Sequence, residues 1–542
     1  MKRSLWAPVL VVFFSVAAGG WLLQQGVDRA ENVYVRLRVL QEVVERIESS
    51  FIDEVDRDAL YNSAIDGLIT ELGDPNSSFL PALAYEDLRI RTQGEYGGLG
   101  LEVVERNDYV TVVSPIPGGP GGRAGIRAGD QFYEIEGVAA DTMTTDQAVE
   151  ILRGRPGTTV TVRMLRPGVE VPIEFSVERE IIHLRAVPFA VMLDDDIGYV
   201  PLQAVMETAS SEVRAAVDSL RTEGMRALVL DLRGNLGGLL DEGIAVADLF
   251  VSEGQAIVET RGREGSQNET FNAGDSDRYE GMPMVVLVDG VSASAAEIIA
   301  GALQDHDRAV LIGETTFGKG SVQSLYPLTG GDVLRLTTAR WYTPAGRSIH
   351  ADPESHTIGE GQTLSISGQP VQEVTIEGRP EFLSDAGRTV YGGGGITPDL
   401  FVAPATLSGA EVEAVRSVFR RGGAFSVALF NFAVAYVGEH ADLAPGFRVG
   451  DADLDRFFAT LSSEEGTAPD EEFADARRFV RYQLEREVAL QAWGDEGQFT
   501  QLLRYDLQLQ RALELLSGVE SVDGLLAVTT DAASVLFPAP GD

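Results

Sequence analysis

The pattern of apolar and polar positions changes its period along the chain, which indicates several kinds of structure. Between Asn32 and Leu72, apolar residues recur at the spacing of amphipathic helices, and Gly73-Asp74-Pro75 is a stop signal. From Tyr96 to about Glu180 the apolar runs are short and separated by turns, with a short helix predicted at Thr145–Leu152. These patterns predict a two-helix arm followed by a small, partly open barrel.

From Ile197 onward, apolar strands alternate with helices. The strands are nearly continuous apolar runs, as expected for parallel strands that are covered on both faces. The predicted strands are Ile197–Pro201, Ala227–Leu232, Met284–Val288 and Ala309–Ile312, and the predicted helices are Ser210–Glu223, Asp241–Phe250 and Ala295–Leu303. This part of the chain is therefore expected to form an α/β layered core.

Two further segments lack chemical motifs. Gly359–Gly395 is rich in Gly, Ser and Thr and is expected to form an inserted loop or hairpin. From Thr406 to the end the chain is acidic and helix-rich, with helices predicted at Glu471–Trp493 and Gln498–Leu516. Packing, capping or self-association is the expected role of this tail.

The N-terminus has the pattern of an export segment. Met1-Lys2-Arg3 is positively charged, and the run from Leu5 to Leu23 carries no charge. Ser15-Val16-Ala17 is a candidate cleavage site, so a removable signal peptide remains an alternative. An uncleaved anchor is favoured because Trp21 and other apolar residues continue beyond that site. We expect an exported, periplasmic protein held at the inner membrane by this segment.

The amino-acid composition excludes several classes of partner and of catalytic group. The 542 residues include 83 acidic and 43 basic ones, and the net charge of −40 argues against nucleic acid as a partner. The absence of cysteine excludes thiol nucleophiles and disulfides. No H-E-x-x-H motif or clustered ligand set is present, so we expect neither a metal nor a cofactor.

Lysine is the informative residue type, since the chain contains only Lys2 and Lys319. Arginine carries surface charge equally well but cannot lose its proton in a protein, so an amine that acts as a base has to be a lysine. Lys319 stands between two glycines, and Phe317 and Val322 are apolar neighbours that would lower its pKa. Gln323 is placed to hold the amine by a hydrogen bond.

Ser294 follows a predicted strand and begins a predicted helix. A serine in this position is most often a simple helix cap, and that alternative stays open. The segment Leu230–Leu240 contains glycines between a strand and a helix, which suits either an oxyanion hole or a phosphate site, although no Walker or G-x-G-x-x-G pattern is present. His350 is the best alternative base, but neither a triad order nor a G-x-S-x-G elbow is found.

Several blocks together resemble the carboxyl-terminal processing proteases, the tail-specific peptidases of family S41. The blocks are LVLDLRGNLGGLLDE, SASAAEIIAGALQD, GETTFGKGSVQ, TTARWYTPAGRSIH and GITPD, and the resemblance covers about Asn32 to Pro404. It implies a crotonase/Clp-protease-like α/β core with an inserted PDZ domain, a helical N-terminal arm and a helical C-terminal extension. The implied segments are 1–26 (signal or anchor), 27–92 (arm), 93–182 (PDZ), 183–405 (Ser–Lys protease core) and 406–542 (extension).

The resemblance also implies roles for single residues. Ser294 would be the nucleophile, Lys319 the base and Gln323 the partner that orients the lysine. The oxyanion hole would be formed by Ala295 with Gly237 or Gly238. The PDZ domain would hold a peptide carboxylate on the loop of Tyr96, Gly97, Gly98, Leu99 and Gly100, and Arg153 would couple this domain to the active site. The family often has a second serine where Ala296 stands.

The function implied is a serine endopeptidase that cleaves exported proteins near their C-termini. Its partners would be proteins with accessible C-terminal tails, and the chain is a candidate homo-oligomer. One alternative is a non-enzymatic PDZ scaffold, which would not need an intact Ser294, Lys319 and Gln323 set. Another is a binder of small hydrophobic ligands on a crotonase-like fold, against which the PDZ-like insertion argues.

Overall fold

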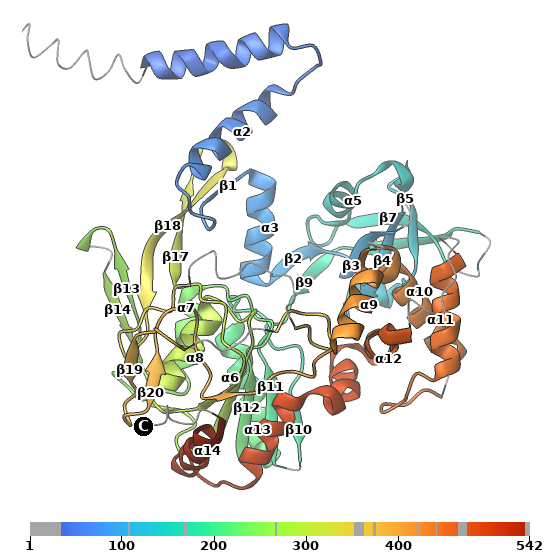
Figure 1. Cartoon of the computed structure of the whole chain (residues 1–542). Coiled ribbons are helices and arrows are strands. Elements are labelled where there is room, and N and C mark those ends of the chain that lie inside the picture. Colours follow the sequence, from blue (N-terminus) through green and yellow to red (C-terminus); the bar gives the residue numbers. More distant parts are fainter. Residues whose placement is uncertain are drawn as a thin grey trace, which may run out of the picture. The chain divides into compact units, whose positions relative to one another are not determined.

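The computed structural model describes residues 34–106, 109–166, 169, 171–194, 196–265, 268–351, 363–371, 376–420, 423–440, 442–463 and 474–536 (Figure 1). The chain forms two compact units, one made of residues 1–85 and 323–337 and the other of residues 86–322 and 338–542. The predicted signal or anchor segment lies outside the described residues. Among the described helices, none combines the length and the apolar character that a membrane span requires.

The first unit contains the predicted helical arm. A helix at 34–50 is followed by α2 (Arg57–Thr70), whose N-terminus is capped by the carboxylate of Asp56. The helix ends just before Gly73-Asp74-Pro75, as the sequence predicts. β1 (Ser78–Leu80) then pairs antiparallel with the first residues of β18 (Val333–Tyr342). β17 (Ser321–Pro327) is the neighbouring strand of β18, and α3 (Ala82–Gln93) continues into the second unit.

The core of the second unit is a six-stranded sheet. Its strand order is β10 (Val191–Leu193), β11 (Ile197–Pro201), β12 (Ala227–Asp231), β15 (Met284–Val288), β16 (Val310–Gly313) and β21 (Leu400–Phe401). β10 is antiparallel to β11, and all other neighbours are parallel. The predicted parallel α/β core is confirmed. Because the strands are parallel, the turns that follow β12, β15 and β16 all emerge at one edge of the sheet.

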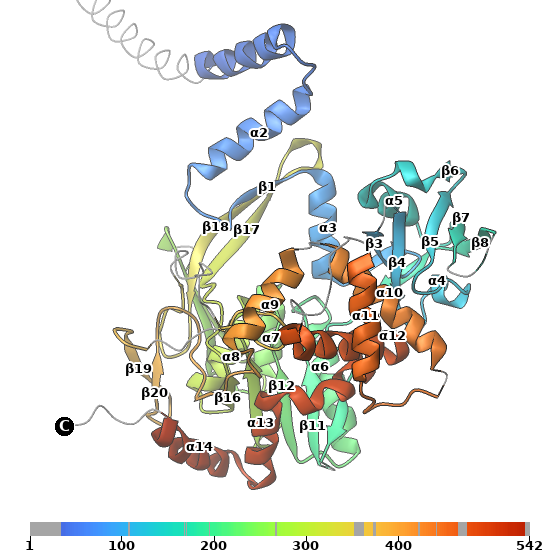
Figure 2. The same cartoon turned by 45° about the vertical axis from the view of Figure 1, so that its right-hand side comes forward.

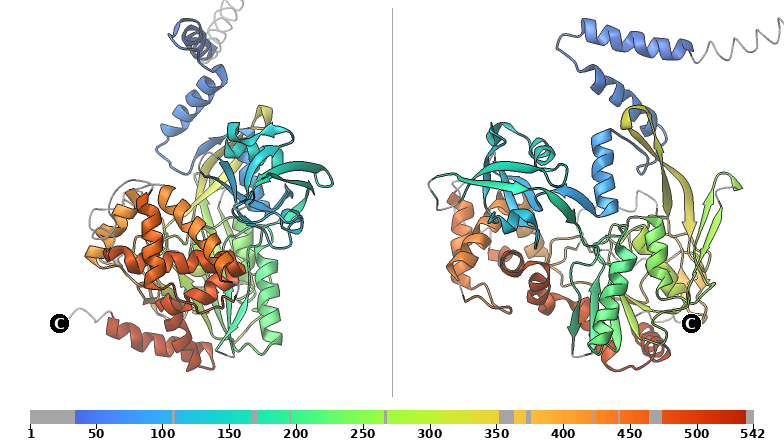
Figure 3. Two further views of the ribbon diagram at one scale, coloured as in Figure 1. Left: turned by 90° about the vertical axis from the view of Figure 1, so that its right-hand side faces the viewer. Right: turned by 180° about the vertical axis from the view of Figure 1, so that it is seen from behind.

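Helices cover both faces of this sheet (Figures 1 and 3). One face packs on α6 (Ala209–Thr222), α7 (Leu240–Asp248) and α8 (Ala295–Asp305). The other face packs on α13 (Leu507–Ser517) and α14 (Val522–Leu536) from the far C-terminus. The buried apolar residues of α13 share one apolar core with alternate strand residues such as Val229 and Leu287, and they are Leu509, Ala512, Leu515 and Leu516. The end of the extension is therefore a layer of the α/β core.

The PDZ-like region is a sheet of β3 (Leu101–Arg106), β4 (Tyr109–Pro115), β5 (Gln131–Ile135), β7 (Thr159–Leu165) and β8 (Ile173–Glu178), in that order. β6 (Val138–Ala139) pairs with β5. The short helices are α4 (Pro120–Arg123) and α5 (Thr145–Leu152), and the latter begins at a Thr144/Gln147 capping box. β2 (Glu95–Gly98) and β9 (Glu180–His183) pair as a two-stranded ribbon at the ends of this region. β3 is an edge strand of the sheet.

The remaining elements are two strand pairs and a group of helices. β13 (Ala256–Gly262) pairs with β14 (Glu269–Asn272), and β19 (Glu381–Leu383) pairs with β20 (Thr389–Tyr391). The second pair is the hairpin expected within Gly359–Gly395. The helices α9 (Gly409–Arg420), α10 (Gly423–Glu439), α11 (Asp451–Ser463) and α12 (Arg477–Leu502) enclose a separate apolar core. In Figure 2 this helical bundle lies beside the PDZ-like strands, and the guanidinium of Arg106 stacks 3.9 Å from the ring of Phe430.

One sequence expectation is corrected here. The predicted helix Gln498–Leu516 is interrupted at residues 503–506, which separate α12 from α13, whereas the separation expected near Gly494 agrees with a break in α12 at that residue (φ 70°). The side chain of His306 is only 8% exposed. Its Nδ1 lies 2.7 Å from a carboxylate oxygen of Asp385 and its Nε2 lies 2.7 Å from the carbonyl of Ala256, because the segment between β19 and β20 folds over it.

The packing of α13 on the sheet predicts a matched pair of stability effects. Leu516 is fully buried against the sheet, whereas Leu507 in the same helix is 44% exposed. We expect Leu516→Ala to lower the free energy of unfolding by about 2–5 kcal/mol, since it leaves a cavity in the core. Leu507→Ala is expected to cost less than about 1 kcal/mol. Equal losses in chemical denaturation of the two variants would contradict the assignment of α13 to the core.

Candidate active site

Three turns meet at the carboxyl edge of the parallel sheet. Residues 232–239 follow β12 and lead into α7, residues 289–294 follow β15 and lead into α8, and residues 314–320 follow β16. The turns carry the predicted glycines, Ser294 and Lys319 respectively. The carbonyl of Asn235 accepts a hydrogen bond from Ala293 N–H at 2.9 Å, and the carbonyl of Ser292 accepts one from Phe317 N–H at 3.0 Å. The fold thus joins all three turns by backbone hydrogen bonds.

Ser294 stands at the N-cap position of α8 but with an unusual backbone. Its φ of 55° and ψ of −116° lie outside the regions that a residue with a side chain normally adopts. Such strain costs about 1–3 kcal/mol and is found mostly where function requires it. The same kind of sharp strand-to-helix turn exposes the nucleophile of α/β-hydrolases. The helix-cap alternative therefore describes the position of Ser294 but does not explain its conformation.

Glu297 connects the serine turn to the lysine turn. Its Oε2 accepts hydrogen bonds from the backbone N–H groups of Ser294 (2.8 Å) and Lys319 (2.9 Å). Its Oε1 accepts from Gly318 N–H (2.7 Å) and from the hydroxyl of Thr316 (2.5 Å). The side chain is completely buried in α8. One carboxylate oxygen therefore holds both the predicted nucleophile and the predicted base.

The buried position of Glu297 also changes its acidity. Burial raises the pKa of the Glu297 carboxyl to about 7, although hydrogen bonds from Thr316, Gly318, Ser294 and Lys319 act in the opposite direction. All four donors favour the ionised form, because a carboxylate accepts at both oxygens. The link between the two turns is consequently sensitive to pH near neutrality.

Only glycine fits at the two positions of the predicted oxyanion turn. Gly237 has φ 89°, and a Cβ there would lie 2.8 Å from the backbone N of Ala295 and 2.9 Å from Cβ of Ser294. A Cβ on Gly238 would lie 2.0 Å from the carbonyl oxygen of Val205. The N–H of Gly237 donates to Oδ1 of Asn235 at 2.8 Å. The turn therefore lies directly against the start of α8.

Lys319 is half-buried in a close-packed turn. Its carbonyl accepts a hydrogen bond from the indole N–H of Trp341 at 3.0 Å. A Cβ on Gly318 would lie 2.6 Å from Cβ of Ala351, and one on Gly320 would lie 3.0 Å from the backbone N of His350. The alternative base, His350, thus neighbours the lysine turn.

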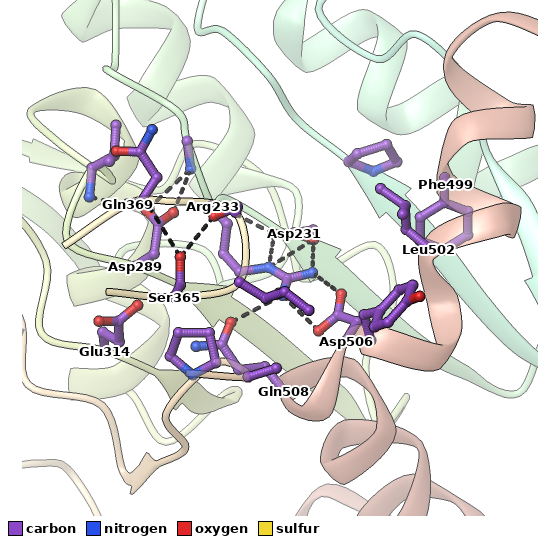
Figure 4. A pocket seen from close by; sticks show the side chains of 18 of the residues that line it. Asp231, Arg233, Asp289, Glu314, Ser365, Gln369, Phe499, Leu502, Asp506 and Gln508 are labelled. Atoms are coloured by element: carbon purple, nitrogen blue, oxygen red, sulfur yellow. Dashed lines mark hydrogen bonds and ion pairs between the residues drawn. The ribbon is translucent and has the colours of Figure 1, made fainter. Parts of the chain in front are cut away.

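Arg233 is the centre of an ionic network at the base of the oxyanion turn (Figure 4). Its Nε and Nη2 donate to the carboxylate of Asp231, at 2.6–3.0 Å. Its Nη1 and Nη2 donate to the two oxygens of Asp506, at 2.8 and 2.7 Å, and Nη1 also donates to Gln508. The hydroxyl of Tyr199 donates to Asp231 at 2.7 Å. Burial opposes the ionisation of Asp506, but Arg233 outweighs it and lowers the pKa of that carboxyl.

Two other predicted residues, Gln323 and Arg153, make hydrogen bonds of their own. Gln323 belongs to the first unit, where its amide donates to the hydroxyl of Thr337 at 3.4 Å, so its role as partner of Lys319 stays a prediction. Arg153 donates to Asp87 at 2.6 Å and stacks on the ring of Tyr96.

The five residues of the predicted PDZ loop fall into two groups. Tyr96, Gly97 and Gly98 are paired with β9, whereas Leu99 and Gly100 form the turn into β3.

The sequence interpretation missed Glu297 and Asp506. Ser294 and Glu297 have the S-x-x-E spacing of a capping box, and this signal was available in the sequence. Asp506 carries no such signal, because its partner Arg233 lies more than 270 residues earlier in the chain.

Comparisons with known proteins indicate the family to which the chain belongs. Residues 196–357 match the model of Peptidase family S41, residues 111–166 that of a PDZ domain, and residues 21–82 the Activating protease CtpB N-terminal domain. A carboxy-terminal-processing protease of Bartonella bacilliformis is 42% identical over 326 residues, covering 59% of this chain and 74% of that protein. The carboxy-terminal processing protease CtpA of Bacillus subtilis is 36% identical over 360 residues, covering 65% and 76%.

Among solved structures, the photosystem II D1 C-terminal processing protease is 28% identical, with a TM-score of 0.34 over 57% of this chain and 89% of that one. A parallel α/β core with a PDZ domain and these sequence matches define a serine protease. The chain belongs to peptidase family S41, the carboxy-terminal-processing proteases.

The position of Glu297 predicts both a catalytic and a pH effect. Glu297→Gln replaces one acceptor oxygen by an NH₂ group that cannot accept the hydrogen bonds of the turns. We expect kcat to fall by about 10- to 100-fold, because small displacements of catalytic groups are costly. The folded-state pKa of Glu297 is raised from 4.5 to about 7. The stability of the native protein relative to the variant should therefore decline as pH rises through this interval and level off above it.

Glu212→Gln is the matched control. Glu212 also accepts a backbone N–H (Val187, 2.9 Å) and a threonine hydroxyl (Thr208, 2.6 Å), but it lies on α6 away from the turns. Unfolding free energies of both variants measured from pH 4.5 to pH 8 separate the two cases. A stability difference for Glu297→Gln that does not change across this range would contradict the raised pKa.

Proposed function

We propose that this protease cleaves peptide bonds with Ser294 as nucleophile and Lys319 as general base. The observation that carries the proposal is that a single oxygen of Glu297 accepts the backbone N–H groups of both residues. The strained backbone of Ser294 and the presence of lysine at only one position in the body of the chain support the same pairing. Arginine, which the chain uses elsewhere, could not replace Lys319 as a base.

The reaction would proceed in two stages. The neutral amine of Lys319 takes the proton of the Ser294 hydroxyl as its oxygen attacks the carbonyl carbon of the substrate. The resulting oxyanion collapses, the C–N bond breaks, and the ammonium of Lys319 returns the proton to the leaving amine. A water molecule, deprotonated by the same lysine, then hydrolyses the acyl-enzyme ester and regenerates Ser294.

The oxyanion would be stabilised by Ala295 N–H, at the N-terminus of α8, together with an N–H of the glycine turn. Gly238 is the better candidate of the two glycines, because the N–H of Gly237 donates to Asn235. The proximity of Gly237 to Ala295 N supports a shared site between the two turns. Gln323 would orient Lys319 by a hydrogen bond to its amine.

Substrate tails would be recognised by the PDZ domain. An extended peptide can add to the exposed edge of β3 and place its carboxylate on the backbone of the Leu99–Gly100 turn. Arg153, at the end of α5, would connect an occupied PDZ domain to catalysis. The substrates would be exported proteins with accessible C-termini, met in the periplasm by an enzyme anchored through residues 1–26 and able to form homo-oligomers.

Substitution of the dyad is the direct test. In cleavage of an unstructured protein with a free C-terminal tail, Ser294→Ala is expected to lower kcat by about 10⁴-fold. Lys319→Arg is expected to lower it by at least about 100-fold, because the guanidinium stays protonated.

His350→Ala is the control for the alternative base and should retain activity within a few-fold of the native enzyme. If His350→Ala loses activity while Lys319→Arg keeps it, the lysine mechanism is wrong. Cleavage that persists after Ser294→Ala would indicate a different nucleophile.

Tail recognition predicts a separate effect on KM. Converting the C-terminal carboxylate of the substrate to an amide removes a charged acceptor worth about 1.5–3 kcal/mol, so KM should rise by about tenfold or more. A peptide that contains the same scissile bond but is too short to reach the PDZ domain should show no such difference. Equal KM values for the acid and the amide of the long substrate would contradict recognition of the carboxylate.

A further inference from the structure

The C-terminal extension contacts Arg233 through Asp506 and Gln508, and Asp506 is the charged partner of the two. This residue lies between α12 and α13 and contacts Arg233, the first side chain of the turn after Leu232. Both oxygens of Asp506 accept from the guanidinium, at 2.8 Å and 2.7 Å. The pairing is bidentate, which fixes the plane of the guanidinium as well as its position.

Asp506 is itself held rigidly. Its Oδ1 accepts the N–H of Leu509 at 3.0 Å, so Asp506 is the N-cap of α13. The buried side chains of Leu509 and Leu516 attach that helix to the sheet. A side chain supported by a packed helix can position a neighbouring group far better than one on a free loop. Asp506 thus transmits the position of α13 to Arg233.

The turn that Arg233 begins is the predicted oxyanion turn. Gly234 N–H donates to Asp289 at 3.0 Å, and Asn235 holds the amide of Gly237. Gly237 is the residue that lies against Ser294 and Ala295. From Arg233 to the oxyanion donors the chain is therefore short and closely bonded, and displacement of the guanidinium would displace the turn.

We propose that Asp506 is a positioning residue for catalysis: through Arg233 it fixes the glycine turn that stabilises the oxyanion. The inference rests on the proposed function of Ser294 and that turn. It assigns the C-terminal extension a catalytic task in addition to covering the sheet. Asp506 also lines a cavity of about 860 Å³ between the extension and the three turns, and Arg233 lies in the wall of the same cavity (Figure 4).

Asp506→Asn is the informative variant. Asparagine caps a helix as well as aspartate does, so α13 should keep its cap while Arg233 loses a charged, bidentate partner. We expect kcat to fall by about 10- to 100-fold with KM within about twofold of the native value. The affinity for a peptide boronate, which forms a tetrahedral adduct with the serine, should weaken in parallel, and the affinity of the PDZ domain for a tail peptide should not change.

Glu411→Gln in the same extension is the matched control. Glu411 forms a bidentate pair with Arg478, at 2.7 and 2.9 Å, and accepts the N–H of Ser408, but it contacts none of the three turns. This variant should keep kcat within about twofold of the native enzyme. A native kcat for Asp506→Asn, or the same loss in both variants, would overturn the proposal.

A double-mutant cycle keeps the test decisive if Asp506→Asn reduces stability. Arg233→Lys breaks the bidentate pair from the other side, and the two changes act on one contact. The double variant should lose no more activity than the worse single variant, whereas additive losses would overturn the inference. Ser294→Ala in the same assay distinguishes failure of the proposed function from failure of this inference. If Ser294→Ala retains activity, the proposed function is wrong. If Ser294→Ala is inactive and Asp506→Asn has native activity, the proposed function stands and Asp506 has no positioning role.

Discussion

A buried carboxylate, that of Glu297, is the contact on which the geometry of this site depends. It accepts four hydrogen bonds from the turns that carry Ser294 and Lys319, and it does so from the first turn of a fully buried helix. An acceptor of this kind is costly to bury and is retained only when its partners are fixed. The strain of Ser294 is tolerated because its N–H is held by this carboxylate on one side and Gly237 lies against it on the other.

The rest of the fold keeps these turns at the same edge. Parallel strand order places β12, β15 and β16 side by side, and helices on both faces bury the sheet completely. One of those layers is formed by α13 and α14, which come from the end of the chain. The extension is thereby tied to the core by apolar burial and by the ion pair of Asp506 with Arg233, and it also contacts the PDZ domain through Phe430 and Arg106.

Ionic groups in this acidic protein are concentrated where elements distant in sequence meet. Arg347 is fully buried and pairs with Asp305 at 2.6 Å, and Arg388 bridges Asp307 and Asp399. These pairs anchor the segments at residues 338–350 and 395–399 to the end of α8 and the turn after it. Arginine suits such positions because its planar fork satisfies two acceptors at once. Lys319, the only lysine besides Lys2, stands at the position where the proposed mechanism needs an amine that can lose its proton.

The sequence by itself determined the element types and most of their bounds, and it predicted the residues that carry chemistry. Ile197–Pro201, Met284–Val288 and Thr145–Leu152 agree with the observed elements because continuous apolar runs and a capping box are local signals. Composition singled out Lys319, and the family blocks predicted Ser294 as the nucleophile. Tertiary structure decided what local patterns do not contain: the strained φ of Ser294, the four bonds to Glu297, the burial of His306, and the contact of Asp506 with Arg233. Each of these depends on which distant segments pack together, because burial and long-range pairing are set by the whole fold rather than by the spacing of neighbours along the chain.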